Sequence, residues 1–595
     1  MILQALYEYY QRKASDITNN MAPEGWEWKE IPFLTVINED GNFVCFKDTR
    51  EDKGKKKRAH AYLVPALGEK KGNGIKSNLL WENIEYMFGI PVPTNAKPNP
   101  DKERVKAQHH SFLERINSLS SDNVFLNAVK RFCTNNQSEA ITKDSIWDQV
   151  LSLNQNLLLA IEQNDTVTPI TDVPEIKKAI NKISMGSDKY GICLISGENS
   201  ELVRLEPPIK GVSGSDGKAE RSFISFNKDS FCSYHKEKNF NSPVGKAPAF
   251  AYTTALNLLL GKDSQNKVYI GDSTTIFWAE KNFQSFNLEH EFAWYISDSP
   301  KDDPDRGIKA VKALYEAAYS GKLPFEEGNR FYVLGLSPNA ARIAVRFWKV
   351  GTVREFAEKI KMHFDDFEIV HGPDEPEYLC LNKILRATAL EFKMENVPPN
   401  LAGAVVTSIL DGSPYPLTLL HQCIRRIRAE RYINRARAAI LKAYINRFNR
   451  INKPLNKEVT MSLDKTNVNP GYLLGRLFSV LERAQNAANN YKEPNAGIRD
   501  RFYGAFSSTP ITVLPILEKL YGHHLGKIEK SKGYFESIKC EIFDKLNAQN
   551  IPAHLSMEEQ ALFAIGYYHQ RQDFFASKTN PTEQDQSTII SEKEN

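Results

Sequence analysis

The chain has 595 residues, of which 41% are hydrophobic and 25% charged, and its formal net charge is +4. This length predicts two to four domains rather than one core, and the composition is that of an ordinary globular protein. Apolar runs stay below the roughly 18 residues of a membrane span, and the N-terminal residues do not resemble a secretion signal. The seven cysteines lie far apart and at no metal-ligand spacing, which favours free thiols in a reducing cytoplasm. We therefore expect a cytoplasmic protein without a membrane span, a metal or another cofactor.

The first predicted elements, in the range 31–65, are β-strands. Phe33–Ile37 and Phe43–Phe46 flank Asp40 and Gly41, a pair of residues typical of a hairpin turn. The connection that follows, 48–58, is rich in lysine, and a nucleic-acid contact and a solvated tip explain it equally well. Its candidate contacts to a nucleic-acid backbone are Lys55, Lys56, Lys57 and Arg58.

A second basic loop spans residues 68–78. Its glycines allow the backbone to approach a ligand closely, and its lysine and asparagine side chains suit phosphates or base edges. The spacing matches no nucleotide-binding motif such as GxxxxGK[ST]. The candidate residues are Lys71, Asn73, Lys76 and Asn78.

The pattern between residues 81 and 163 is mostly helical, and short strands return between 190 and 226. A loop of glycine, serine and lysine at 210–218 interrupts these strands. It is the best candidate in this region for a backbone that approaches nucleic acid. The signal is weak by itself, because many hairpins carry such loops.

Two further strands and a long series of helices follow. Residues 331–337 and 342–348 predict strands on either side of a Ser-Pro-Asn turn. Thr352 and Glu355 have the spacing of a capping box ahead of an amphipathic helix. Beyond about residue 376 the β pattern nearly vanishes, and 461–570 predicts a bundle of helices.

The predicted fold class is α+β, with a mixed α/β N-terminal region followed by an all-α helical bundle. The last twenty residues are polar, which is typical of a disordered tail. We expect four domains: 1–165 with the basic loops, 166–375 rich in strands, 376–460 with a basic helix, and 461–595 as the C-terminal bundle with its tail.

Positive charge is concentrated between His421 and Lys453. This stretch has ten basic residues and one acid, a local charge of +9, whereas the whole chain carries +4. It contains no Pro or Gly, and its apolar residues recur at helical spacing, which predicts one helix. The alternative to contact with a polyanion is a solvated helix face, but the charge imbalance favours the phosphate backbone of a nucleic acid. The candidates are Arg425, Arg428, Arg431, Arg435, Lys442, Arg447 and Arg450.

The sequence shows no catalytic constellation. The pairs His109–His110 and His523–His524 are adjacent and lack the i, i+4 spacing of a helical metal site, and no HExxH, GxSxG or paired CxxC motif occurs. We therefore expect that the protein is not an enzyme and binds no metal. Two alternatives stay open: a metal-dependent nuclease built from distant carboxylates, and an RNA-binding scaffold.

Several short stretches carry a family resemblance. They are Met1–Tyr7, Ala22–Trp26, Ser225–Asn227, Ser233–Tyr234, Ala251–Asn257, Thr275–Trp278, Phe331–Arg342, Gly475–Phe478, Ile498–Arg501 and Gly566–Gln570. With them the chain resembles the Csd-type large subunit of the type I-C CRISPR surveillance complex, Cascade. The stretches span nearly the whole chain, and none of them is a catalytic signature.

The resemblance implies a scaffold that reads DNA and performs no chemistry itself. Its mixed α/β part would read the protospacer-adjacent motif on the duplex and help to open it, while guide pairing reads the remaining sequence. The helical part would lie along the displaced strand. The implied partners are CRISPR RNA, target double-stranded DNA and its displaced strand, the backbone and small subunits of Cascade, and the helicase–nuclease that degrades the target.

Candidate motif-reading residues follow from the resemblance. The first set is Lys210, Gly211, Ser213, Ser215, Lys218, Asn227 and Asn241, and the second is Lys71, Asn73, Lys76 and Asn78. In this family a small subunit can also be translated separately from the same gene. Met461 would start a product of suitable size, although an ordinary internal methionine is an equally good explanation.

Overall fold

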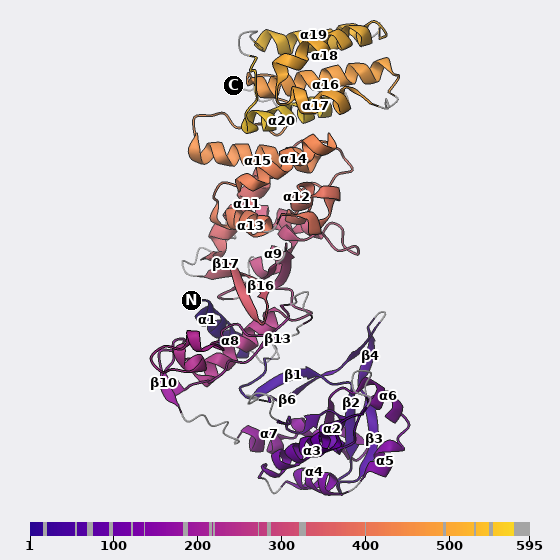
Figure 1. The fold of residues 1–595 in the computed structure, drawn as a ribbon, viewed down its shortest axis with the longest axis vertical. Coiled ribbons are helices and arrows are strands. Elements are labelled where there is room, and N and C mark those ends of the chain that lie inside the picture. The colour runs from indigo at the N-terminus through magenta and orange to yellow at the C-terminus, as the bar shows by residue number, and fades with distance from the viewer. Residues whose placement is uncertain are drawn as a thin grey trace, which may run out of the picture. The chain divides into compact units, whose positions relative to one another are not determined.

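The computed structural model describes most of the chain, which divides into two compact units (Figure 1). Unit 1 contains Met1–Gly261 and Pro338–Ile343, and unit 2 contains Lys262–Ser337 and Ala344–Asn595. The described residues are 1–575 without 16–20, 54–55, 68–74, 94–98, 121–122, 136, 182–188, 213–216, 218–219, 272, 282–286, 320–328, 399, 492–495, 529–530 and 547–550. The tail predicted to be disordered lies outside them.

A five-stranded sheet organises the first part of unit 1. Its order is β3-β2-β8-β7, with β9 paired to β8, and β2 runs parallel to β8 but antiparallel to β3. Every residue of β2 is buried, as expected for an apolar central strand. The hairpin predicted around Gly41 is confirmed. The strands are β2 (Phe33–Ile37), β3 (Phe43–Asp48), β7 (Trp81–Glu82), β8 (Leu157–Gln163) and β9 (Thr166–Pro169).

Helices and two-stranded ribbons complete unit 1. The helices of 1–181 are α1 (Ile2–Ala14), α2 (Ile84–Phe88), α3 (Lys102–Asn117), α4 (Val124–Thr134), α5 (Ser138–Thr142), α6 (Trp147–Leu153) and α7 (Pro174–Asn181). Helix α1 packs on α8 (Lys246–Leu259). The ribbons are β1 (Trp26–Glu30) with β6 (Ala61–Pro65), β4 (Arg50–Lys53) with β5 (Lys56–Ala59), β10 (Tyr190–Ile192) with β11 (Asn199–Glu201), and β12 (Ile209–Lys210) with β13 (Glu220–Arg221).

Unit 2 begins with a four-stranded sheet in sequential order. The strands are β14 (Lys267–Ile270), β15 (Ser273–Ala279), β16 (Arg330–Asn339) and β17 (Arg342–Thr352). Thr352 and Glu355 form the predicted capping box at the start of α11 (Val353–Phe367). Beyond Thr352 the described residues contain helices and turns without strands. These findings confirm an α+β fold with a helical C-terminal region.

The helices of unit 2 share one apolar core, which extends from Val268 to Tyr568. Residues on both sides of positions 375 and 460 belong to it, and the four-domain division stays a prediction. The helices before the bundle are α9 (Leu288–Ile296), α10 (Arg306–Tyr319), α12 (Leu381–Ala387), α13 (Leu401–Asp411), α14 (Leu417–Glu430) and α15 (Arg435–Asn452). The bundle consists of α16 (Pro470–Ala488), α17 (Ile498–Phe506), α18 (Pro510–Leu525), α19 (Lys532–Lys545) and α20 (Met557–Phe575) (Figure 1).

Glycines allow α16 and α20 to touch backbone to backbone. A Cβ added at Gly475 would collide with the carbonyl oxygen of Phe563, and one added at Gly566 would collide with that of Tyr472. Arg476 is fully buried beside this crossing, where its Nε donates to Gln570 Oε1 (3.1 Å). Residues of two stretches that carry the family resemblance therefore build the centre of the bundle.

Helices able to cross a membrane are absent from the described part of the chain: none there is both long and apolar enough.

Candidate nucleic-acid interface

The basic stretch forms two helices instead of the predicted single one. Helix α14 ends where Arg431 adopts a left-handed conformation (φ 51°), and α15 begins after Asn434, whose side chain accepts from the backbone N–H of Arg437 at 3.0 Å. The step of seven residues from Arg428 to Arg435 crosses this break. These two side chains therefore do not share a helix face, and the prediction of one helix is wrong.

The cations of α15 are mostly buried and serve the protein's own packing. Arg435 donates to the carbonyl oxygens of Pro376 and Glu377, and Lys442 Nζ donates to the carbonyl oxygen of Asp366 at 3.0 Å. Arg435 is 4% exposed and Lys442 is 5% exposed. Burial lowers the pKa of both Arg435 and Lys442. The prediction that Arg435 and Lys442 contact a phosphate backbone is therefore wrong.

Asp366 is the centre of a buried ionic cluster that joins α11 to α15. Its carboxylate accepts from Arg447 Nε (2.6 Å) and Arg450 Nη2 (3.0 Å). The Asp366 and Arg447 side chains are each 1% exposed, and the Arg447 guanidinium also lies over the Tyr415 ring at 4.2 Å. Burial raises the pKa of Asp366 although both guanidinium groups act in the opposite direction. Arg447 is thus a structural cation, which corrects its predicted role.

Arg450 differs from Arg447, because its side chain is 39% exposed. It nevertheless carries two ion pairs, with Asp366 and, through Nε, with Glu458 at 2.8 Å. The hydrogen bond to Glu458 raises its pKa. Its charge is therefore already balanced within the protein, and a phosphate contact would have to compete with two carboxylates.

The free positive charge of the stretch lies on α14 and at its end. Arg425, Arg428 and Arg431 are exposed, and their guanidinium groups form no ion pair or hydrogen bond with any residue that the structure describes. His421, Arg425 and Arg428 follow the spacing i, i+4, i+7, which places them on one helix face. The predicted phosphate contact stays a prediction for the three arginines. The sequence-based prediction did not include His421, although its spacing of four residues from Arg425 indicates the same helix face.

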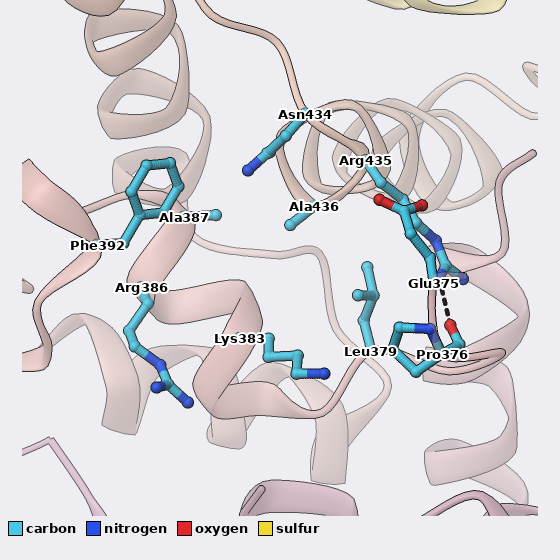
Figure 2. Close-up of a pocket in the computed structure, with 10 residues that line it drawn as sticks. All are labelled: Glu375, Pro376, Leu379, Lys383, Arg386, Ala387, Phe392, Asn434, Arg435 and Ala436. Atoms are coloured by element: carbon cyan, nitrogen blue, oxygen red, sulfur yellow. Dashed lines mark hydrogen bonds between the residues drawn. The ribbon is translucent and has the colours of Figure 1, made fainter. Parts of the chain in front are cut away.

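A hollow of about 360 Å³ lies below the start of α15 (Figure 2). Its lining includes Lys383 and Arg386 of α12, Phe392, and the amide of Asn434. Arg386 is paired with Asp298, and Arg435 at the wall holds a carbonyl oxygen (Figure 2). Of the three basic residues that line the hollow, only Lys383 is exposed without an ion pair among the described residues.

The basic loop at 48–58 forms the β4–β5 hairpin. Lys57 is exposed and lies opposite Asp52, while Arg58 pairs with Glu30 at 2.9 Å. Lys55 lies outside the described residues, and so does the side chain of Lys56. The hairpin remains a candidate contact, with its positive charge partly balanced by neighbouring carboxylates.

The loop at 210–218 is described at residues 210–212 and at Gly217. Lys210 Nζ lies 3.0 Å from Glu27 and 3.8 Å from Glu220, and its backbone N–H donates to Asn257 Oδ1 at 2.7 Å. Gly211 has φ 88°, and an added Cβ would meet the carbonyl oxygen of Leu260 at 2.6 Å. This glycine therefore allows a close approach to α8 rather than to a ligand. Ser213, Ser215 and Lys218 lie outside the described residues.

The second set of predicted motif readers is divided. Lys71 and Asn73 lie outside the described residues, and Lys76 is half-buried. Asn78 is 8% exposed, and its Nδ2 donates to Glu82 Oε1 at 2.9 Å. Since its amide is buried in this internal contact, Asn78 cannot reach a base edge in this conformation, and that prediction is corrected.

The two remaining asparagines lie on neighbouring loops of unit 1. Asn227 is exposed, and its Oδ1 accepts from Arg342 Nη2 at 2.6 Å. Asn241 uses both ends of its amide to hold backbone groups of residues 233–238. It therefore shapes a loop, and both hydrogens of its Nδ2 are engaged. Its predicted role as a base reader stays a prediction.

Within the described residues, no group of three or more His, Cys, Asp or Glu side chains could hold a metal ion. All seven cysteines are free thiols, as the spacing predicted.

A comparison with protein families decides the relationship that the short stretches suggested. The family model described as CRISPR-associated protein (Cas_Csd1) matches residues 6–575. The chain belongs to the Cas_Csd1 family. This assignment confirms the resemblance to the Csd-type subunit, and no curated protein matches the chain.

Membership of the Cas_Csd1 family gives context to residues that the structure places inside the protein. Gly475, Arg476 and Gly566 hold the helical bundle together, and Asn257 holds the loop at Lys210. These members of the resembling stretches are structural. The stretch Ser233–Tyr234 differs, because it is exposed at the surface.

Proposed function

We propose that this chain is the large subunit of a type I-C RNA-guided interference complex. In this role it recognises the protospacer-adjacent motif on target double-stranded DNA, helps to unwind it, stabilises the displaced strand and contributes to recruiting the helicase–nuclease. The observation that carries the proposal is the family match over residues 6–575. Its partners would be CRISPR RNA, the target and the other Cascade subunits, within the cytoplasm.

The division of labour follows from the energetics of strand exchange. The guide–target heteroduplex is about as stable as the DNA duplex that it replaces, and opening costs roughly 1.4 kcal/mol per base step. Contacts between protein and DNA backbone must therefore favour the open state. The exposed arginines of α14 have the free charge that such contacts need, and we assign them to the displaced strand.

We propose further that the chain breaks no bond itself and needs no cofactor. Incubating the purified chain with single- and double-stranded DNA and Mg²⁺ or Mn²⁺ should leave both substrates intact. Cleavage that a carboxylate substitution abolishes would instead establish the nuclease alternative.

The central test compares complexes assembled with and without this chain, around a guide of known sequence. In gel-shift titrations, the complete complex should bind a target with its adjacent motif more tightly than the same target with that motif scrambled. The complex without the chain should lose this preference. Equal binding of both targets by the complete complex would refute motif reading, and preference for RNA without motif dependence would favour the scaffold alternative.

We also propose that Met461 is an internal translation start, from which a separate small subunit containing α16–α20 begins. In the full chain its carbonyl oxygen accepts from the backbone N–H of Val370 at 2.9 Å, and Tyr568 of α20 donates to the carbonyl oxygen of Val370 at 2.8 Å. A separate product would lose these partners and the packing of α20 on α15. Mass spectrometry of the expressed gene should show a product that starts at Met461, and a Met461→Leu variant should lose it. A product that persists in this variant would refute the site.

A further inference from the structure

A tight turn in unit 1 carries strain without using glycine. Ser233 and Lys236 are bridge partners, and the N–H of Lys236 donates to the carbonyl oxygen of Ser233 at 2.9 Å. The two residues between them, Tyr234 and His235, both have positive φ angles, 51° and 56°. Two-residue turns of this kind normally use Asn-Gly or similar pairs, because other L residues rarely adopt the left-handed region. Tyr-His therefore gives no turn signal in the sequence.

One side chain holds this turn in place. Asn241 Oδ1 accepts from the N–H of Ser233 (2.9 Å), and its Nδ2 donates to the carbonyl oxygens of Lys236 (2.8 Å) and Lys238 (3.0 Å). Strained backbone persists only where its surroundings enforce it, and such places concentrate at functional sites. The turn is thus a rigid element whose conformation the protein enforces.

The turn presents an aromatic ring directly to solvent. Tyr234 is 93% exposed. Three residues earlier in the chain, Phe231 is also exposed, and the Arg342 guanidinium lies over the Phe231 ring at 4.9 Å while donating to Asn227. A single exposed aromatic residue is common on protein surfaces. A ring at the tip of an enforced, strained turn indicates a functional role instead.

The charged residues around the Tyr234 ring favour an anionic partner. Lys228 and Lys236 are exposed and have no ion pair within the part of the chain that the structure describes, and Lys238 is half-buried nearby. Two exposed carboxylates, Asp229 and Glu237, partly offset them. Aromatic rings with neighbouring cations are the common surface for unpaired nucleotides, where the base stacks and the cations meet the phosphates.

We propose that Tyr234 stacks on an unpaired base of the target DNA where the duplex is opened, with Lys228 and Lys236 near the adjoining phosphates. This inference rests on the proposed function and assigns one contact within it. A rigid turn suits the task, because the conformational entropy of its backbone is already lost before the base arrives. Asn241 is then a positioning residue, and its predicted importance is explained without a base contact of its own.

The test uses the assembled complex with its guide and compares Tyr234→Ala, Tyr234→Phe and Asn241→Ala with the wild type. Tyr190→Ala, which removes another exposed tyrosine of unit 1, is the matched control. Tyr234→Ala should weaken target binding about tenfold, the size expected for one lost stacking contact. The dependence of affinity on salt should not change, because no charge is removed. Tyr234→Phe should retain the affinity, and Asn241→Ala should lose part of it.

A direct contact should also be visible chemically. Targets with 5-iodouracil at single positions beside the motif should photo-crosslink to Tyr234 at one of them, as identified by mass spectrometry. Unchanged binding by Tyr234→Ala, in a wild-type complex that does read the motif, would overturn the stacking contact and leave the proposed function standing. Reduced incorporation of Tyr234→Ala into the complex would overturn it as well, because it would assign the turn to a protein partner. A wild-type complex without motif preference would refute the proposed function itself.

Discussion

Replacing Asp366 with Asn should destabilise unit 2 strongly. The substitution keeps the size of the side chain but leaves Arg447, which is 1% exposed, without a buried counter-charge. It also removes one of the two ion pairs of Arg450. Removing one partner of a buried ion pair costs about 3–5 kcal/mol. With an m-value of roughly 3 kcal/mol/M, the urea midpoint of this unit should fall by about 1 M or more.

The neighbouring Asp365 provides a matched control. Its side chain is 44% exposed, and it pairs with Lys361 at 2.9 Å on the surface of α11. Surface ion pairs contribute about 0–1 kcal/mol, and the hydrogen bond that Tyr315 donates to Asp365 Oδ1 can be kept by an Asn oxygen. Asp365→Asn should therefore shift the midpoint only slightly. Circular dichroism at 222 nm during urea titration would follow the helices of unit 2. Equal effects of the two substitutions would refute the structural role assigned to the buried cluster.

Three further predictions concern charge, packing and pH. Replacing Arg425, Arg428 and Arg431 with Ala should reduce the slope of log affinity against log salt by about 0.7 per lost contact to a single strand. The control Arg354→Ala, which removes a surface ion pair of α11, should leave this slope unchanged. Gly475→Ala should lower the free energy of unfolding by about 1–3 kcal/mol, because the added Cβ would collide with α20. The control Gly533→Ala, where a Cβ meets open space, should leave the free energy of unfolding unchanged. Equal urea midpoints of the two variants would refute the close crossing of α16 and α20. Burial lowers the pKa of His569 to about 4, below the unfolded value of about 6.5. As the pH decreases, His569 is therefore protonated in the unfolded state at a higher pH than in the folded state. The free energy of unfolding should fall between about pH 6.5 and 4, by up to roughly 3 kcal/mol. Urea midpoints at several pH values would measure this loss, and His569→Gln should reduce the dependence.

Local signals in the sequence predicted much of the secondary structure. The β2–β3 hairpin follows from Gly41 between two apolar runs, and the start of α11 follows from Thr352 and Glu355. Both features depend on residues close together in the chain. The break between α14 and α15 could not be predicted in the same way, because Arg431 adopts its left-handed conformation without the glycine or asparagine that usually marks one.

The candidate site was harder to predict than the fold, because burial depends on residues far away in the chain. Arg428 and Arg435 look alike in the sequence, and yet the first is exposed while the second lies against the carbonyl oxygens of Pro376 and Glu377. Asn78 and Asn241 likewise have the chemistry of base readers, but internal contacts occupy their amides. A count of charges or amides along the chain measures what could bind, whereas the tertiary fold decides which groups remain free.

The placement of charge explains how one basic stretch can serve two purposes. Buried arginines must be matched by carboxylates or carbonyl oxygens, since an unmatched buried charge is very costly. In α15 that requirement is met by Asp366 and by backbone oxygens from the segments that α15 joins. Because α15 is fixed in this way, α14, which packs beside it, holds its exposed arginines on a rigid support. The buried charges therefore stabilise the surface on which the free charges are presented, and both follow from the same concentration of arginine.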